Sequence, residues 1–238
     1  MLAALFYTEP LSASSTPQAP PVNVEALVKE VKKIDKGHAD HFATVLVQGR
    51  DGRIKPLDTL AIDLLNKISG KNSLFGLTYN QIVLGMATKP DAWKQIEMIK
   101  VSHPKVKEML GLKESQKIFS YADAFDRYGQ YKLGSAAEEA LRKRAAERGK
   151  YEQDLIKVDE RINIAYLVYS GRFMVVFPLE GDHNNKWYYP DHAMKNFPQK
   201  ASAEVYELLK GNSIGFSKGL AEGDWKMANS AIDDIKAY

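Results

Sequence analysis

Histidine offers this sequence its most versatile chemistry, because the chain has five histidines and no cysteine. His38 and His41 are three residues apart in a segment with helical spacing, so their imidazoles can face the same side of one helix. Two imidazoles at that spacing can reach one metal ion or one porphyrin edge. No third ligand stands nearby in the sequence, and ordinary residues at an exposed helix end are the alternative interpretation.

A second candidate pair, His183 and His192, lies on either side of the aromatic sequence Trp-Tyr-Tyr at 187–189. Asp182 and Asp191 each precede one of these histidines and are expected to orient its ring. The pattern indicates either a contact to haem or to a metal, or the ordinary polar surface of a hairpin. Both histidine pairs are therefore candidate cofactor-binding residues.

Other kinds of site are poorly represented. Without cysteine, the chain has no disulfide, thiol nucleophile, zinc ribbon, iron–sulfur cluster or CxxCH haem-attachment site. Ser213 lies between Gly211 and Gly215, but the strand that must precede a hydrolase nucleophile is missing. Gly70-Lys71 lacks the earlier glycine of a phosphate-binding loop. We therefore predict no catalytic residue and no resident metal.

The segment Gly49–Thr59 concentrates glycine, proline, three cations and two carboxylates in eleven residues. The glycines allow a tight turn, Pro56 fixes the backbone, and Asp58 can cap the helix that follows. Arg53 and Lys55 occupy alternate positions of an extended stretch, so their side chains should point the same way. The segment predicts either a structurally demanding loop or a partner-binding surface. The candidate partner-binding residues are Arg53, Lys55, Pro56 and Asp58.

These residues must be positioned by elements that the apolar periodicity predicts. Helical spacing, capping residues and terminal glycines predict helices over 24–42, from Asp58 or Thr59 to 70, 78–88, 104–110, 135–171 with a break at Gly149, 201–220 and 223–237. Thr78 to Gln81 and Ser135 to Glu138 have the form of capping boxes. Within 151–169, apolar residues recur every three or four positions, which predicts a helix packed along another helix.

Strands are fewer and shorter. Residues 44–48 and 54–56 read as extended segments joined by the turn at 49–53, and 173–179 with 187–189 form the clearest hairpin. The sequence therefore predicts an α+β fold that is predominantly helical with a small antiparallel sheet or hairpin.

The chain divides into a short leading segment and one large domain. Residues 1–22 combine the apolar stretch 2–7 with four prolines, and this stretch is too short for a signal peptide or a spanning helix. We expect 1–22 to be a flexible linker or membrane-proximal segment and 23–238 to be one helix-rich domain. The 33 basic and 30 acidic residues give a net charge of only +3, so no nucleic-acid partner is expected.

Several phrases, in order, resemble the fused cytochrome c biogenesis proteins of the CcsB–CcsA (ResB–ResC) type, which act in the System II pathway. The phrases are Leu46–Gln48, Gly52–Ala61, Asn66–Lys71, Gly76–Met86, Ile99–Val101 and Asp154–Tyr166. In that family, a phrase like Gly-Arg-Ile-Lys-Pro-Leu-Asp-Thr-Leu-Ala opens an extracytoplasmic region that stands between membrane helices. The similarity covers about residues 40 to 237.

The resemblance implies a parent membrane protein that carries haem outward and joins it to the CxxCH thiols of apocytochrome c. The family handles haem with a tryptophan-rich WWD motif and with histidines in or beside membrane helices. Trp93, Trp187 and Trp225 each stand alone here, so no haem ligand of the family can be carried over. The resemblance thus implies a domain on the periplasmic face of the bacterial cytoplasmic membrane, with no cofactor of its own and with haem left to the parent protein.

The preferred hypothesis is therefore a non-catalytic periplasmic domain, tethered in a cytochrome c synthase. It would help to assemble the membrane-embedded parts of that synthase or would position apocytochrome c for haem attachment. A haem-binding domain that uses His38 and His41, or His183 and His192, is the alternative. An uncharacterised hydrolase is the third hypothesis.

Overall fold

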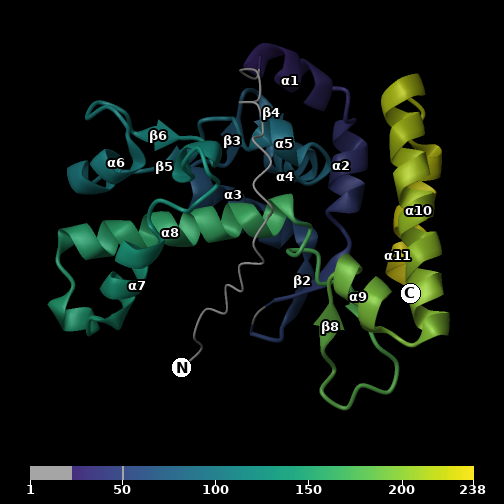
Figure 1. Ribbon diagram of the computed structural model, residues 1–238. Helices are drawn as coiled ribbons and strands as arrows, with labels where there is room; N and C mark the ends of the chain where they lie inside the picture. Colours follow the sequence, from purple (N-terminus) through teal and green to yellow (C-terminus); the bar gives the residue numbers. More distant parts are fainter. Residues whose placement is uncertain (1–22, 50) are drawn as a thin grey trace.

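The computed structural model describes residues 23–49 and 51–238, which are predominantly helical and carry four two-stranded antiparallel sheets. The predicted α+β class, helix-rich with small antiparallel hairpins, is confirmed (Figure 1). The predicted linker at 1–22 lies outside the described residues. Among the helices of the described part, none combines the length and the apolar character that crossing a bilayer requires.

The described part contains the α-helices α1 (Val24–Val31), α2 (Lys36–Phe42), α3 (Leu57–Ser69), α4 (Tyr79–Thr88), α5 (Pro90–Trp93), α6 (Pro104–Leu110), α7 (Gly134–Arg142), α8 (Lys150–Tyr169), α9 (Pro190–Asn196), α10 (Gln199–Glu222) and α11 (Lys226–Ala237). Two short 3₁₀ turns lie at Ala122–Ala124 and Ala145–Glu147. The paired strands are β1 (Leu46–Gln48) with β2 (Ile54–Pro56), β3 (Ser73–Leu74) with β4 (Leu77–Thr78), β5 (Ile99–Lys100) with β6 (Ile118–Phe119), and β7 (Phe177–Pro178) with β8 (Trp187–Tyr188).

Helix α8 crosses the centre of the molecule and packs against α3, α4, α6 and α7 (Figure 1). Its predicted packing seam is confirmed, because Leu155, Val158, Ile162 and Ala165 are all buried. Side chains of α3 and α4 belong to the same hydrophobic core, which also includes buried residues of α2 and α11.

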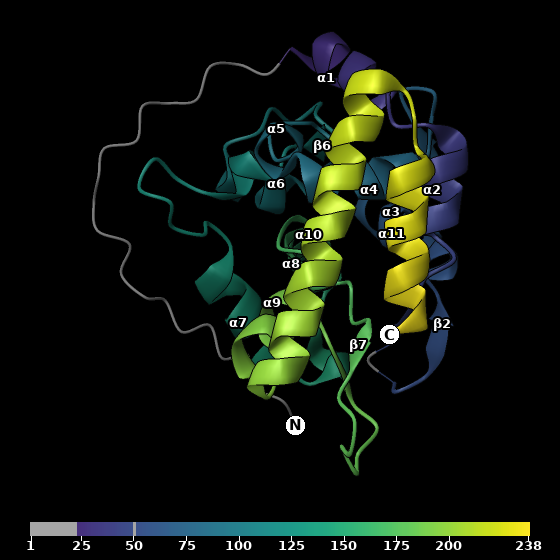
Figure 2. The ribbon, with the colours of Figure 1, turned by 90° about the vertical axis from the view of Figure 1, so that its right-hand side faces the viewer.

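The C-terminal helices α10 and α11 form a hairpin that stands beside the central core (Figure 2). The predicted pair of tail helices is confirmed, and α11 also packs against α2. The helices approach closely at Gly215, where an added Cβ would come within 2.8 Å of the Ala228 backbone. At Gly219 an added Cβ would overlap the Trp225 ring. The C-terminal hairpin therefore depends on glycine at both positions.

Several predicted helix starts differ from the observed ones. The capping box of Thr78 and Gln81 is confirmed at the start of α4. The predicted box at Ser135 is wrong, because α7 begins one residue earlier, after Leu133, without a side-chain cap. The predicted cap by Asp58 is also wrong, since α3 begins at Leu57 directly after Pro56, and Asp58 lies inside its first turn. An acidic residue there is favourable for the helix dipole without being the cap.

The single helix predicted over 24–42 is two helices. Asp35 accepts a hydrogen bond from the His38 backbone amide at 2.8 Å and caps α2, so a second helix begins at this point. A residue of α4 stabilises the break, because the Gln81 side chain donates a hydrogen bond to the Ile34 carbonyl at 2.9 Å. A helical period alone cannot reveal such a break when the same apolar spacing continues on both sides.

The β1–β2 and β7–β8 hairpins project from the lower side of the molecule in Figure 1. Gly52, with a φ of 78°, makes the turn of the first hairpin possible. Gln48 joins the two hairpins, because its side chain donates to the Asn185 carbonyl at 2.9 Å and accepts from the Trp187 amide at 2.8 Å. The two predicted hairpins, one around the turn at 49–53 and one formed by 173–179 with 187–189, are confirmed with shorter strands. Gln48 connects them.

Candidate functional site

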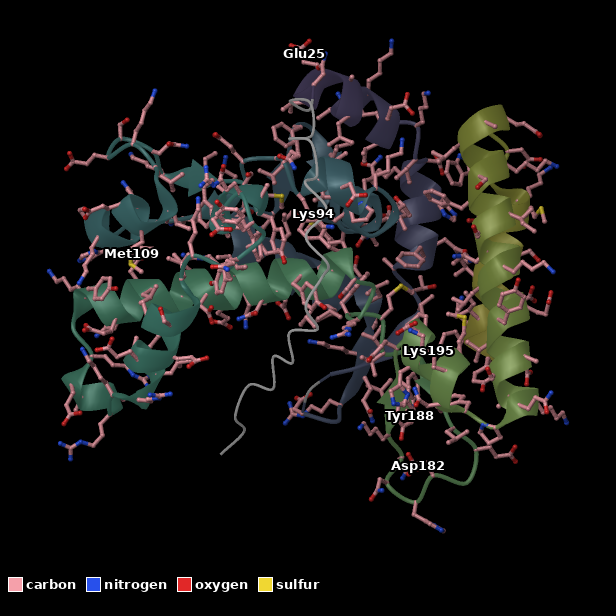
Figure 3. The ribbon with its side chains drawn as sticks, in the orientation of Figure 1. Glu25, Lys94, Met109, Asp182, Tyr188 and Lys195 are labelled. Atoms are coloured by element: carbon pink, nitrogen blue, oxygen red, sulfur yellow. The ribbon has the colours of Figure 1, made fainter. Side chains whose placement is uncertain are left out.

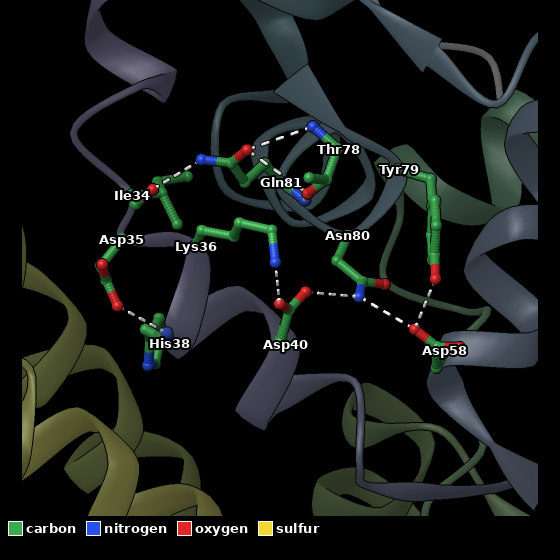
Figure 4. Close-up of polar contacts among 10 residues, drawn as sticks. All are labelled: Ile34, Asp35, Lys36, His38, Asp40, Asp58, Thr78, Tyr79, Asn80 and Gln81. Atoms are coloured by element: carbon green, nitrogen blue, oxygen red, sulfur yellow. Dashed lines mark hydrogen bonds and ion pairs between the residues drawn. The ribbon is translucent and has the colours of Figure 1, made fainter. Parts of the chain in front are cut away.

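Asp58, one of the predicted partner-binding residues, lies in a polar network between helices (Figure 4). Its Oδ1 accepts hydrogen bonds from the Tyr79 hydroxyl and from the Asn80 side-chain amide, both at 3.0 Å. The same Asn80 amide donates to Asp40 Oδ1 at 3.0 Å. Since Asp40, Asp58 and Asn80 belong to α2, α3 and α4, the network ties these three helices together.

The charge of Asp40 is compensated by a lysine, whereas Asp58 accepts hydrogen bonds from the neutral side chains of Tyr79 and Asn80. Lys36 Nζ lies 2.7 Å from Asp40 Oδ2, and this hydrogen bond is the main reason that the pKa of Asp40 is lowered. The hydrogen bond to Asp58 raises the pKa of Tyr79, so the phenol stays protonated and donates. Asn80 is buried. Each carboxylate thus has an internal partner, and the arrangement acts as a structural clamp.

The sequence did not reveal this clamp, because its members come from three separate helices. The capping box at Thr78 gave the only related signal. It fixes the start of α4 and therefore places Tyr79 and Asn80 in the first turn of that helix.

The first half of the segment Gly49–Thr59 belongs to the β1–β2 hairpin and has a different environment. The register pairs Leu46 with Pro56 and Gln48 with Ile54, so these residues share one face of the β1–β2 hairpin, while Val47 and Lys55 share the other. Val47 is buried in the core, whereas Leu46 and Ile54 are exposed. Two apolar side chains therefore stand on the solvent face of a two-stranded hairpin.

Arg53 and Lys55 do not contact the same partner. The Arg53 side chain is 86% exposed, with Asp51 at 3.5 Å. Lys55 Nζ lies 3.6 Å from Asp63 Oδ2 on α3. Pro56 is exposed and ends the hairpin at the start of α3. Arg53, Lys55 and Pro56 thus occur together on the hairpin, whereas the Asp58 side chain is bonded to α4.

A groove of about 410 Å³ lies next to the hairpin, between β1, α3, α8 and the segment that precedes β7. Its polar rim includes Lys55, Asp63, Lys67, Glu160 and Arg172. Lys67 and Glu160 face each other across α3 and α8 at 3.0 Å. Apolar side chains line the groove between these charges. Lys55 belongs to this groove, whereas Leu46 and Ile54 are on the opposite face of the hairpin. The exposed residues Leu46, Arg53 and Ile54 are here called the hairpin surface.

The imidazole of His38 packs within the fold and has one nitrogen hydrogen-bonded. It is buried, stacks on the Trp225 indole with ring centroids 4.4 Å apart, and its Nδ1 lies 2.7 Å from Asn229 Oδ1. Because an amide oxygen only accepts, Nδ1 carries the proton in this contact. Burial lowers the pKa of His38, which favours the neutral ring.

His41 has a separate partner, since its Nε2 lies 3.0 Å from Asp233 Oδ1. Asn229 and Asp233 are both on α11, so the two histidines anchor α2 to the C-terminal hairpin. Residues 23–49 and 51–238 contain no group of three or more His, Cys, Asp or Glu side chains that could hold a metal.

Among the described residues, no contact joins His183 to His192. His183 is exposed in the loop between β7 and β8, and His192 lies on α9, stacked on Tyr188 at 4.7 Å. The predicted orienting role of the aspartates is wrong. Asp182 accepts from the Tyr188 hydroxyl at 3.1 Å, and Asp191 pairs with Lys195 at 2.8 Å.

Ser213 lies within α10 rather than at a turn between a strand and a helix, so the geometry of a nucleophile elbow is missing. It lines a cleft of about 390 Å³ together with His38. Within the described part of the chain, no hydrogen bond joins this serine to the imidazole, whose Nδ1 faces an amide instead of a carboxylate.

The phrases that define the family resemblance meet in space around α3. Asp58, from the phrase Gly52–Ala61, binds Tyr79 and Asn80 from the phrase Gly76–Met86. Arg161, from the phrase Asp154–Tyr166, donates to the Lys67 carbonyl at 3.2 Å and to the Lys100 carbonyl at 2.8 Å. Most of these phrases therefore serve the fold, and the hairpin is the part that faces outward.

Comparison with known proteins adds one relative. No family model matches the chain. Protein NrfI of Wolinella succinogenes is 36% identical over 187 residues, which cover 79% of this chain and 20% of NrfI. This chain is similar to one segment of NrfI. It therefore spans about a fifth of the length of that relative.

Proposed function

We propose that this chain is a periplasmic accessory domain of a membrane-bound System II cytochrome c synthase. Two observations support the proposal: the ordered phrases that resemble CcsB–CcsA proteins, and the similarity to NrfI over most of the described domain. The NrfI similarity supports a role in cytochrome c haem attachment. Under this proposal the parent protein handles haem, and the domain itself supplies binding and positioning.

In this proposal, the hairpin surface is where the domain binds its partner. The observation that carries it is the division of the phrase Gly52–Ala61: its helical half is bonded internally, while Arg53 and Ile54 face solvent. Exposed apolar side chains beside a cation can bind an extended polypeptide, because apolar burial supplies affinity and the charge orients the partner. We assign apocytochrome c as the first partner and the membrane-embedded parts of the same synthase as the second.

A photo-crosslinking amino acid placed at Ile54 in the full-length synthase tests this assignment in cells that mature cytochrome c. Leu141 on α7 is the matched control position, since it is 50% exposed and Ile54 is 51% exposed. We expect adducts with the cytochrome polypeptide, or with membrane-embedded segments of the synthase, from position 54 and not from position 141. Equal yields at the two positions, or no adduct at position 54, would contradict the proposal.

A further inference from the structure

An apolar patch lies at the opposite end of the molecule from the hairpin surface. It forms a groove of about 400 Å³ between α1 and the turn that joins β3 to β4. The apolar side chains that line it are Val24, Val28 and Phe75. Figure 3 labels Glu25 of α1 at one end of the molecule and Asp182 of the β7–β8 loop at the other. Figures 1 and 2 agree on this placement of α1 and the hairpins.

Phe75 has an unfavourable backbone conformation for its type. Its φ is 55°, in the left-handed region, and Gly76 follows with a φ of 73°. Two-residue turns of this kind favour asparagine or glycine at the first position. A residue with a Cβ costs roughly 1–2 kcal/mol there. The residue nevertheless keeps 41% of its surface exposed, so a large part of this phenylalanine is accessible to a partner.

The rim of the patch is positively charged. Lys29 and Lys32 line the groove, and neither forms an ion pair with any residue that the structure describes. Glu25 also lines the groove. The second acid of α1, Glu30, is already paired with Lys33 at 2.6 Å and with Lys89 at 3.3 Å. The net local charge therefore suits a negatively charged partner.

We propose that this patch, formed by Val24, Val28 and Phe75 with Lys29 and Lys32, binds the surface of an anionic lipid bilayer. Exposed aromatic and aliphatic side chains rimmed by lysines insert at the boundary between headgroups and acyl chains, while the ammonium groups stay with the phosphates. The proposal rests on the proposed function and extends it by giving the domain an orientation. With the α1 end on the bilayer, the hairpin surface points away from it, which favours apocytochrome c over membrane-embedded segments as its partner.

Vesicle binding by the 238-residue chain tests the proposal. The probe is a suspension of phosphatidylcholine vesicles with and without phosphatidylglycerol, and co-sedimentation gives the partition coefficient. Phe75→Gly removes the aromatic ring and also relieves the positive φ, so this variant should unfold at the same or a higher temperature. We expect its partition coefficient on anionic vesicles to fall about tenfold.

Tyr128→Gly is the matched control, because Tyr128 is another exposed aromatic residue in a turn, outside the patch. It should leave vesicle binding unchanged. Lys29→Gln and Lys32→Gln should each weaken binding to anionic vesicles about fivefold. Lys113→Gln and Lys117→Gln, at exposed positions elsewhere, should have no such effect.

Three results would overturn the inference. The chain could fail to bind anionic vesicles, or Phe75→Gly and Tyr128→Gly could reduce binding equally. Alternatively, Phe75→Gly could convert a dimer to a monomer in analytical ultracentrifugation, which would assign the patch to a second copy of the chain. Under each of these results an adduct from position 54 is still expected, and only the preference for apocytochrome c over membrane-embedded segments is lost, so the docking function and the membrane inference fail separately.

Discussion

The phrase Gly52–Ala61 places two kinds of residue side by side in the sequence and in different environments in the fold. In its second half, Leu57 and Ala61 are buried and Asp58 is clamped to α4. In its first half, Arg53 and Ile54 face solvent on the hairpin surface. Buried contacts and hydrogen bonds account for Leu57, Asp58 and Ala61, whereas the side chains of Arg53 and Ile54 have no comparable packing role. We therefore expect substitutions in the hairpin to change partner binding and substitutions in α3 to change the stability of the fold.

The largest expected effect separates Leu57 from Ile54. Leu57→Ala should lower the free energy of unfolding by about 3 kcal/mol, because it removes a fully buried side chain and leaves a cavity. Ile54→Ala should change it by less than about 0.5 kcal/mol. Urea denaturation of both variants gives the two values. A similar loss for both residues would show that the hairpin face is part of the core, and the comparison would fail.

The clamp should give the next largest effect. Asp58→Ala removes the acceptor of Tyr79 and one acceptor of Asn80, so we expect a loss of about 2 kcal/mol in the free energy of unfolding. Asp58→Asn keeps one carbonyl oxygen as acceptor and should recover part of this loss. Neither variant should weaken partner binding at temperatures where it is folded. If Asp58→Asn is stable but has lost binding, then Asp58 belongs to the docking surface after all.

The pH dependence of the free energy of unfolding tests whether His38 is a structural residue. Its pKa is lowered by burial from an ordinary value of 6.5, so the unfolded chain binds a proton at a pH where the folded chain does not. The free energy of unfolding should therefore fall as the pH drops below about 6.5, and the slope should end below the folded pKa. In His38→Asn, whose amide can still donate to Asn229, this dependence should flatten.

The exposed His183 provides the control for that experiment, since His183→Asn should keep the wild-type pH dependence of unfolding. Denaturant titrations between pH 5 and pH 7.5 supply the slopes. A haemin titration of the same two variants adds a check on the alternative function. A Soret band that is lost only in His38→Asn would reopen haem binding and would contradict the assignment of His38 to the fold.

Local signals in the sequence predicted much of the architecture. The seam of α8 followed from its apolar spacing, the β1–β2 turn from Gly52, and the start of α4 from the pair Thr78 and Gln81. In each case the determining residues are neighbours in the chain, so short-range physics is sufficient. The predictions failed where tertiary contacts decide. Gln81 stabilises the break before α2 from outside 24–42, and the local signal within that range is limited to the capping residue Asp35.

The candidate site follows the same rule. The turn at Gly52 is a local feature, so the sequence could place Arg53 at the hairpin, but alternation could not show which face of the hairpin packs on the core and therefore did not predict that Ile54 is exposed. The partners of His38, His41 and Asp58 lie on α11 and α4, far away in the sequence, and no spacing rule connects them. The sequence could therefore propose ligand pairs, but only the packing of α11 on α2 shows that His38 Nδ1 and His41 Nε2 lie against side chains of α11.

The most direct test of the docking claim is an NMR titration of the ¹⁵N-labelled chain with a synthetic apocytochrome c peptide that carries CxxCH. We predict that chemical shift changes concentrate on the hairpin surface and that the double variant Arg53→Glu/Ile54→Ser weakens binding at least about tenfold. Leu141→Ser/Arg142→Glu on α7 is the matched control, since the Arg142 side chain is 82% exposed and the Arg53 side chain 86%. Equal weakening by both double variants, or shift changes that avoid the hairpin, would contradict the account.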